Sequence, residues 1–181
     1  MKLRPLLLLM FAVAWTAKAH SADWLPGGVF VQGGAGQDAT RAATVGVIWP
    51  WAWRHSLGDA EVTGLTEVFL SHWSTRAEQG RRSFTQVGAV VPLLRYRFSQ
   101  GRSPWFLEAG IGIAVMDPIY RTAHKEFSTR FNFVDVLGIG HSFGERHKHE
   151  LGLRLMHLSN GGIQHPNPGE NLVQLRYALM F

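Results

Sequence analysis

The 181-residue chain has no cysteine, so it has neither a disulfide framework nor thiol chemistry available. After its first nineteen residues it also lacks any apolar run long enough to form a transmembrane helix. No segment shows the 3.6-residue spacing of apolar positions that predicts an amphipathic helix. The chain is instead rich in glycine, in aromatic residues and in short segments of alternating polarity, which together favour an all-β protein.

Lysine is scarce after the first nineteen residues, where only Lys125 and Lys148 occur, and arginine supplies most of the positive charge. Without Lys2, Arg4 and Lys18, the 18 basic residues fall to 15, against 13 acidic ones, which gives a net charge of +2. A nucleic-acid-binding protein would need a larger basic excess, clustered on one face. We therefore expect no nucleic acid partner.

Residues 1–19 have the features of a signal peptide. They combine a basic start, an apolar stretch too short to cross a bilayer and a small-x-small cleavage site at residues 17–19. We expect residues 1–19 to be removed on export. Residues 20–181 have the length of one ordinary domain.

Eight short segments of this domain have the alternation that predicts β-strands, and turn-forming residues separate them. The segments are residues 27–36, 43–53, 61–73, 84–98, 105–116, 130–143, 149–159 and 171–181. Such an arrangement predicts an antiparallel up-and-down meander, which can close into a barrel and leave no unpaired strand edge.

The alternation separates a membrane barrel from a soluble one. In residues 105–116 the apolar side chains share one face, while Glu108 lies on the other. In residues 171–181 Arg176 likewise opposes an apolar face. Charged residues inside a narrow barrel and apolar residues outside are the outer-membrane pattern, and a soluble barrel would reverse it. The sequence thus predicts an eight-stranded antiparallel transmembrane β-barrel of the outer-membrane type.

Two further features support the membrane barrel. The final Phe181, on an alternating strand, resembles the assembly signal of bacterial outer-membrane barrels. Tryptophans lie towards the strand ends, as an interfacial girdle requires. They are Trp24, Trp49, Trp51, Trp53, Trp73 and Trp105.

The interior of an eight-stranded barrel is just wide enough for its side chains, so the barrel should be a poor channel. We expect Glu67 and Glu108 to meet Arg95, Arg97 or Arg176 there in a buried network. Function should then lie on the loops or on the outer wall.

Asp135 departs from the alternation because it shares its parity with the apolar residues of segment 130–143. Either this acid faces lipid, or a β-bulge reverses the parity of the strand. The sequence leaves both alternatives open.

The candidate site lies in residues 156–172, MHLSNGGIQHPNPGENL. His157 and Ser159 continue the outward parity of Leu151, Leu153 and Leu155, so they should stand side by side on the lipid-facing wall. Polar groups are unexpected there unless they have a function. A serine hydroxyl is a weak nucleophile that needs a neighbouring base, and His157 can supply one. In the alternative reading the strand has ended and both residues lie in a hydrated loop.

The histidine needs a partner that fixes its tautomer and stabilises its charged form. The next strand begins at Glu170 or Asn171, beside His157. Outward parity falls on Asn171, but we favour Glu170 because a carboxylate stabilises an imidazolium better. The expected oxyanion donors are Asn160 and the backbone amides of Gly161 and Gly162.

The segment HLSNGGIQHPNPGEN, residues 157–171, near the end of an exported barrel, resembles the PagL family of outer-membrane lipid A 3-O-deacylases. The similarity is sharp over these residues and consistent with the rest of the chain in strand count and length. It implies an esterase on the outer wall that removes the 3-hydroxyacyl chain at position 3 of lipid A, without metal or cofactor. It also implies Ser159 as nucleophile, His157 as base, Glu170 as acid and Asn160 as oxyanion donor.

On this interpretation the protein lies in the cell outer membrane of a Gram-negative bacterium and acts on lipopolysaccharide in the outer leaflet. A homodimer is compatible with the sequence. The first alternative is a non-enzymatic small barrel, an adhesin or structural protein, in which Ser159 and His157 are dispensable. The second is a phospholipase or acyltransferase on the same scaffold.

Overall fold

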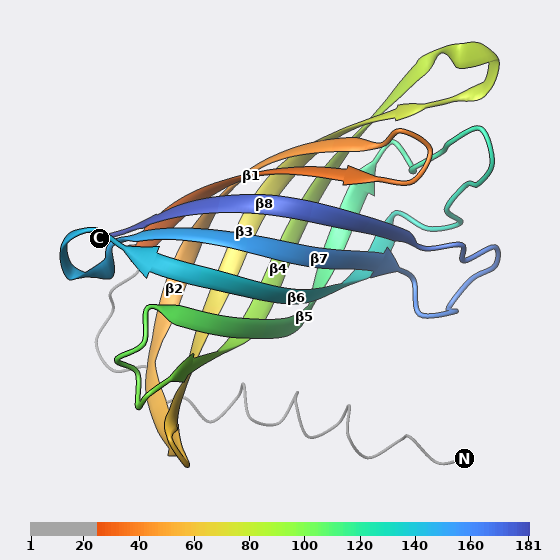
Figure 1. Cartoon of the computed structure of the whole chain (residues 1–181). Coiled ribbons are helices and arrows are strands. Elements are labelled where there is room, and N and C mark those ends of the chain that lie inside the picture. The colour runs from red at the N-terminus through yellow and green to blue at the C-terminus, as the bar shows by residue number, and fades with distance from the viewer. Residues whose placement is uncertain (1–24) are drawn as a thin grey trace.

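The computed structural model describes residues 25–181, so the expected signal peptide and Trp24 lie outside the described residues. Eight strands form a closed barrel in which each strand pairs with its neighbours in sequence and β8 pairs with β1 (Figure 1). All pairs are antiparallel, which confirms the expected fold class. No helix within residues 25–181 has both the length and the apolar character needed to cross a bilayer.

The strands are β1 (Gly28–Gly36), β2 (Arg41–Leu57), β3 (Ala60–Arg76), β4 (Arg82–Phe98), β5 (Trp105–Asp117), β6 (Phe131–Phe143), β7 (His149–Ser159) and β8 (Glu170–Met180). Two single 3₁₀ turns, η1 (Glu78–Gly80) and η2 (Glu145–His147), lie in connections. We call the end that carries residues 37–40, 77–81, 118–130 and 160–169 the loop end. The opposite, turn end holds the short connections and Phe181, whose N–H donates to the carbonyl of Gly27 at 2.8 Å.

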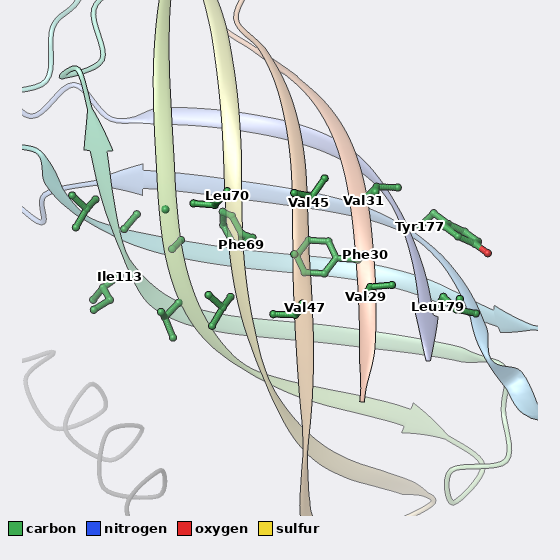
Figure 2. A pocket seen from close by; sticks show the side chains of 17 residues that line it. Val29, Phe30, Val31, Val45, Val47, Phe69, Leu70, Ile113, Tyr177 and Leu179 are labelled. Carbon is green, nitrogen blue, oxygen red and sulfur yellow. The ribbon is translucent and has the colours of Figure 1, made fainter. Parts of the chain in front are cut away.

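The alternation expected from the sequence is present in the strands that carried the prediction. Along β5, side chains alternate strictly between exposed and buried, with Glu108 buried. Along β8, Val173 and Leu175 are exposed, whereas Arg176 is 1% exposed. Figure 2 shows Val29, Val31, Val45 and Leu70 lining an apolar hollow formed mainly by β1–β5.

A connected ion-pair network fills the barrel interior. Arg154 donates to Glu67 at 2.7 and 2.8 Å and to Glu108 at 2.6 Å. Arg176 donates to the same Glu67 at 2.7 Å, and Arg95 donates to Glu108 at 3.1 Å. These contacts confirm the buried network expected from the sequence and explain how the charges are tolerated, since each has hydrogen-bonded partners of opposite sign.

The parity of Asp135 is settled by the register of β6. The pairing of β6 with β5 and with β7 runs without a register shift, so no bulge reverses its faces. Asp135 is therefore on the outward face, with Ile111 opposite it on β5 and His157 opposite it on β7. The strand irregularity lies elsewhere, in β2 between Pro50 and Arg54.

One tryptophan does not fit the expected girdle. Trp73 is completely buried inside the barrel, where its ring lies edge-on against Tyr120, with 5.4 Å between the ring centroids. Its indole N–H donates to the Ser71 hydroxyl at 2.9 Å. Because position 73 has inward parity on β3, proximity to a strand end does not bring this side chain to the membrane surface.

Candidate active site

Strand β7 carries the predicted nucleophile and base. The strand continues to Ser159, which excludes the alternative that both residues lie in a loop beyond its end. Leu153 and Leu155 are 52% and 55% exposed on the outward face, and His157 and Ser159 follow on that face, half-buried. The described structure has no hydrogen bond between the Ser159 hydroxyl and the imidazole, although side chains two apart on a strand point the same way. Catalytic hydrogen bonds of this kind often form only with substrate bound.

The imidazole of His157 has its hydrogen-bonding partner on β8. Its Nδ1 lies 2.8 Å from Oδ1 of Asn171, and the two residues are a directly opposed cross-strand pair. With Oδ1 as acceptor, the ring proton is on Nδ1 and Nε2 is left unprotonated. The imidazole is thus held from β8 on the outer wall.

Glu170, the acid predicted from the sequence, lies on the other side of the barrel wall. Its carboxylate is completely buried and accepts from Tyr120 Oη at 2.9 Å and from the backbone N–H of Gln37 at 2.9 Å. Lys125 Nζ lies 2.7 Å from the same carboxylate. Pairing of β8 begins at Glu170, opposite Leu158, so alternation turns position 170 inward and position 171 outward. The structure therefore brings Asn171, and not Glu170, to His157.

Asp135 is the site neighbour that the sequence did not assign. It lies directly across from His157 on β6, just as Asn171 lies across from it on β8. Three polar residues thus form a row over three adjacent strands, and the next outward row, which contains Leu137 and Leu155, is apolar. The available signal was the parity conflict itself, since a carboxylate on a lipid-facing position needs a reason to be there.

Asn160 organises the loop of residues 160–169. Its side-chain amide donates to the Gln164 carbonyl at 2.7 Å and to the Ser128 hydroxyl at 2.9 Å, which uses both Nδ2 protons. Its Oδ1 accepts from the backbone N–H of Gly162 at 2.9 Å, and the backbone N–H of Asn160 donates to Oδ1 of Asn167 at 3.0 Å. The predicted donors Asn160 and Gly162 are consequently occupied by contacts within this loop and with Ser128.

The Gly161 amide is the one predicted oxyanion donor still free to bind a ligand. It donates no hydrogen bond to any of residues 25–181, and Gly161 is exposed two residues after Ser159 in the chain. Its φ of 65° lies in the left-handed region, which favours glycine. A Cβ added there would lie 3.1 Å from the ring of Phe133 on β6. Both the conformation and the close packing therefore favour glycine.

Residues 118–130 fold back over the loop end and bury Tyr120 and Phe127. Burial raises the pKa of the Tyr120 hydroxyl above its usual value, and the nearby Glu170 carboxylate adds to the rise. The tyrosine therefore stays protonated and donates to that carboxylate.

Nowhere in residues 25–181 do three or more histidine, aspartate or glutamate side chains form a group that could hold a metal ion.

Comparison with known proteins identifies related chains. Residues 40–180 match the family model described as Lipid A 3-O-deacylase (PagL). A lipid A deacylase PagL of Bordetella bronchiseptica is 32% identical over 168 residues, covering 92% of this chain and 88% of the relative. One of Pseudomonas aeruginosa is 28% identical over 177 residues, covering 96% and 97%. The crystal structure of the outer membrane enzyme PagL has the same fold, with a TM-score of 0.73 and 24% identity over 85% of this chain and 99% of that one.

Proposed function

The chain belongs to the lipid A 3-O-deacylase (PagL) family, and on that premise we propose that it hydrolyses the ester of the 3-hydroxyacyl chain at position 3 of lipid A. Its place is the outer membrane, as for the solved enzyme of the same fold. The observation that carries the proposal is that His157 and Ser159 lie on the same outward face of β7. The imidazole of His157 is held there by Asn171 on β8.

In the proposed reaction, Nε2 of His157 takes the proton of the Ser159 hydroxyl as its oxygen attacks the ester carbonyl. The Gly161 amide donates to the oxyanion that forms. When the intermediate collapses, His157 gives the proton to the departing 3-oxygen of the glucosamine, and the acyl group stays on Ser159. A water molecule, deprotonated by His157, then hydrolyses this acyl-enzyme and releases the fatty acid.

Asn171 and Asp135 have separate roles in this proposal. Asn171 holds Nδ1 and so keeps Nε2 directed at the serine, as the third member of a catalytic triad does. Asp135 places a carboxylate across the strand pair from the ring, where its charge favours the imidazolium that forms during the reaction.

The surroundings of the site fit a substrate embedded in a lipid layer. From His157 towards the turn end, exposed leucines continue the outward faces of three neighbouring strands. They are Leu137 on β6, Leu151, Leu153 and Leu155 on β7, and Leu175 on β8. Acyl chains can lie against this apolar wall while the ester reaches Ser159 at the end of β7. Nothing in the mechanism requires a second copy of the chain.

The test is mass spectrometry of lipopolysaccharide after incubation with the refolded protein in detergent. We expect the wild type to remove one 3-hydroxyacyl group, and Ser159→Ala and His157→Asn to leave lipid A intact. Ser74→Ala is the matched control because Ser74 also lies on the outward face near the loop end, but on β3, across the barrel.

Other outcomes separate the alternatives. Recovery of the acyl group on another lipid, and not as free fatty acid, would identify an acyltransferase. Cleavage of diacyl phospholipids alone would identify a phospholipase. An unchanged spectrum from a demonstrably folded barrel would reject the enzyme and favour an adhesin or structural role.

A further inference from the structure

Glu170 lies between two residues that both contact the imidazole of His157. On one side, Asn171 holds Nδ1 at 2.8 Å. On the other, Gly169 packs so closely that an added Cβ would lie 2.8 Å from Cε1 of the ring. Because both neighbours are joined to Glu170 by the backbone, the position of its main chain determines the position of both contacts.

Lys125 holds this segment from the loop of residues 118–130. Its ammonium group lies 2.7 Å from Glu170 Oε2, 2.8 Å from the Gly169 carbonyl and 2.7 Å from Gln37 Oε1. The ammonium group donates hydrogen bonds to the Gly169 carbonyl and to Gln37 Oε1, and its contact with Glu170 is an ion pair. The side chain is only 13% exposed, and the Glu170 carboxylate is not exposed at all. Ion pairs shielded in this way are much less weakened by solvent than surface pairs.

Tyr120 fixes the same carboxylate from the barrel interior. Its hydroxyl donates to Glu170 Oε2, so it must accept from Thr40, whose Oγ1 lies 2.7 Å away. Thr75 continues this chain at 2.8 Å from Thr40. Glu170 is therefore connected to residues 118–130, to the connection of residues 37–40 and to the end of β3.

We propose that Lys125, Glu170 and Tyr120 form a positioning clip, through which residues 118–130 hold Gly169 and Asn171 against the catalytic histidine. The inference rests on the proposed role of His157 as the base. We place none of the three residues in contact with the substrate, because Glu170 and Tyr120 are completely buried and the Lys125 ammonium is held by Glu170, Gly169 and Gln37. Glu170 thus contributes to catalysis through its neighbours and not as the acid of the triad.

The first experiment compares Lys125→Met with Lys148→Met, the same change at the exposed turn end. For Lys125→Met we expect kcat for lipid A deacylation to fall about 10- to 100-fold, as for a small misplacement of a catalytic group, with KM within about twofold of wild type. Lys148→Met should leave both constants unchanged. Circular dichroism and heat-dependent mobility on gels establish that each variant is a folded barrel.

A double-mutant cycle tests whether the clip acts through Asn171. If it does, Lys125→Met should lower kcat less than about threefold when Asn171 is already alanine. The full loss in the Asn171→Ala background, an unchanged kcat, or a loss confined to KM would each overturn the proposal. Should Lys125→Met fail to fold, Tyr120→Phe removes a single hydroxyl from the clip and takes its place in the cycle. The wild type and Ser159→Ala test the proposed function separately, since both chains keep the clip intact.

Discussion

Asn171 is the residue whose role depends most directly on a single atom. Its Oδ1 accepts from the imidazole, and nothing else in residues 25–181 holds Nδ1 of His157. We expect Asn171→Ala to lower kcat about 10- to 100-fold, in the range found when a group that orients a functional histidine is removed. Asn171→Asp keeps an acceptor oxygen of nearly the same shape and should retain most of the activity.

Kinetic assays of the two variants under identical detergent conditions check this expectation. Equal losses in both would mean that the amide N–H₂ matters more than Oδ1. Full activity in Asn171→Ala would remove the residue from the mechanism altogether.

At the level of single residues, the sequence predicted His157 and Ser159 correctly as outward neighbours, because parity alone determines which face of a strand they share. Parity also placed Asn171 outward and Glu170 inward, but chemical reasoning favoured a carboxylate over an amide as the partner of His157. Parity could not show whether β8 includes Glu170 or starts after it; in the structure Glu170 pairs with Leu158 and so belongs to the strand, which fixes its side chain inward.

At the level of elements, the proposed site depends on the alignment of three strands, β6, β7 and β8, and not on any one of them. The register aligns Asp135, His157 and Asn171, although each was considered separately in the sequence. We expect Asp135→Asn to lower kcat about 3- to 10-fold, equivalent to roughly 1 kcal/mol, because the variant loses a charge that favours the imidazolium. Folding should be unaffected because the substituted side chain is outward-facing.

The measurement is kcat at saturating lipid A, with Asp117→Asn as the matched control on the exposed end of β5. A loss of the same size in both variants would point to a general effect of surface charge. No loss in Asp135→Asn would leave the carboxylate without a catalytic role.

The strands were predictable to within a few residues at their ends, and β7 agrees at both ends, because alternation is a local property. The loop of residues 118–130 was not predictable. Tyr120 and Lys125 meet Glu170 from 50 and 45 positions away, and no periodic pattern encodes such a contact. Their partners follow from the closure of the barrel, which brings β1, β5 and β8 to a common end.

At the scale of the whole molecule, the charged interior holds the barrel together. Arg154 connects β7 to Glu67 on β3 and to Glu108 on β5. Replacing it with methionine leaves both carboxylates buried without their main partner, and we expect a loss of about 3–5 kcal/mol in the free energy of unfolding. Arg41→Met, at an exposed position of β2, should change it by less than about 0.5 kcal/mol.

Denaturant unfolding in detergent, followed by tryptophan fluorescence, measures both variants. A midpoint for Arg154→Met equal to that of wild type would mean that the interior reorganises or takes up water at little cost. The same result would weaken the view that this network determines the stability of the barrel.

The barrel interior is filled with side chains, and the proposed catalytic pair, His157 and Ser159, is on the outer surface of the wall. A substrate therefore cannot thread through the protein and must arrive sideways, by diffusion in two dimensions within its own leaflet. The encounter rate then follows the number of lipid A molecules per unit area, and not their concentration in bulk solution. Diluting the leaflet with an inert amphiphile slows the enzyme even when the total amount of substrate is constant.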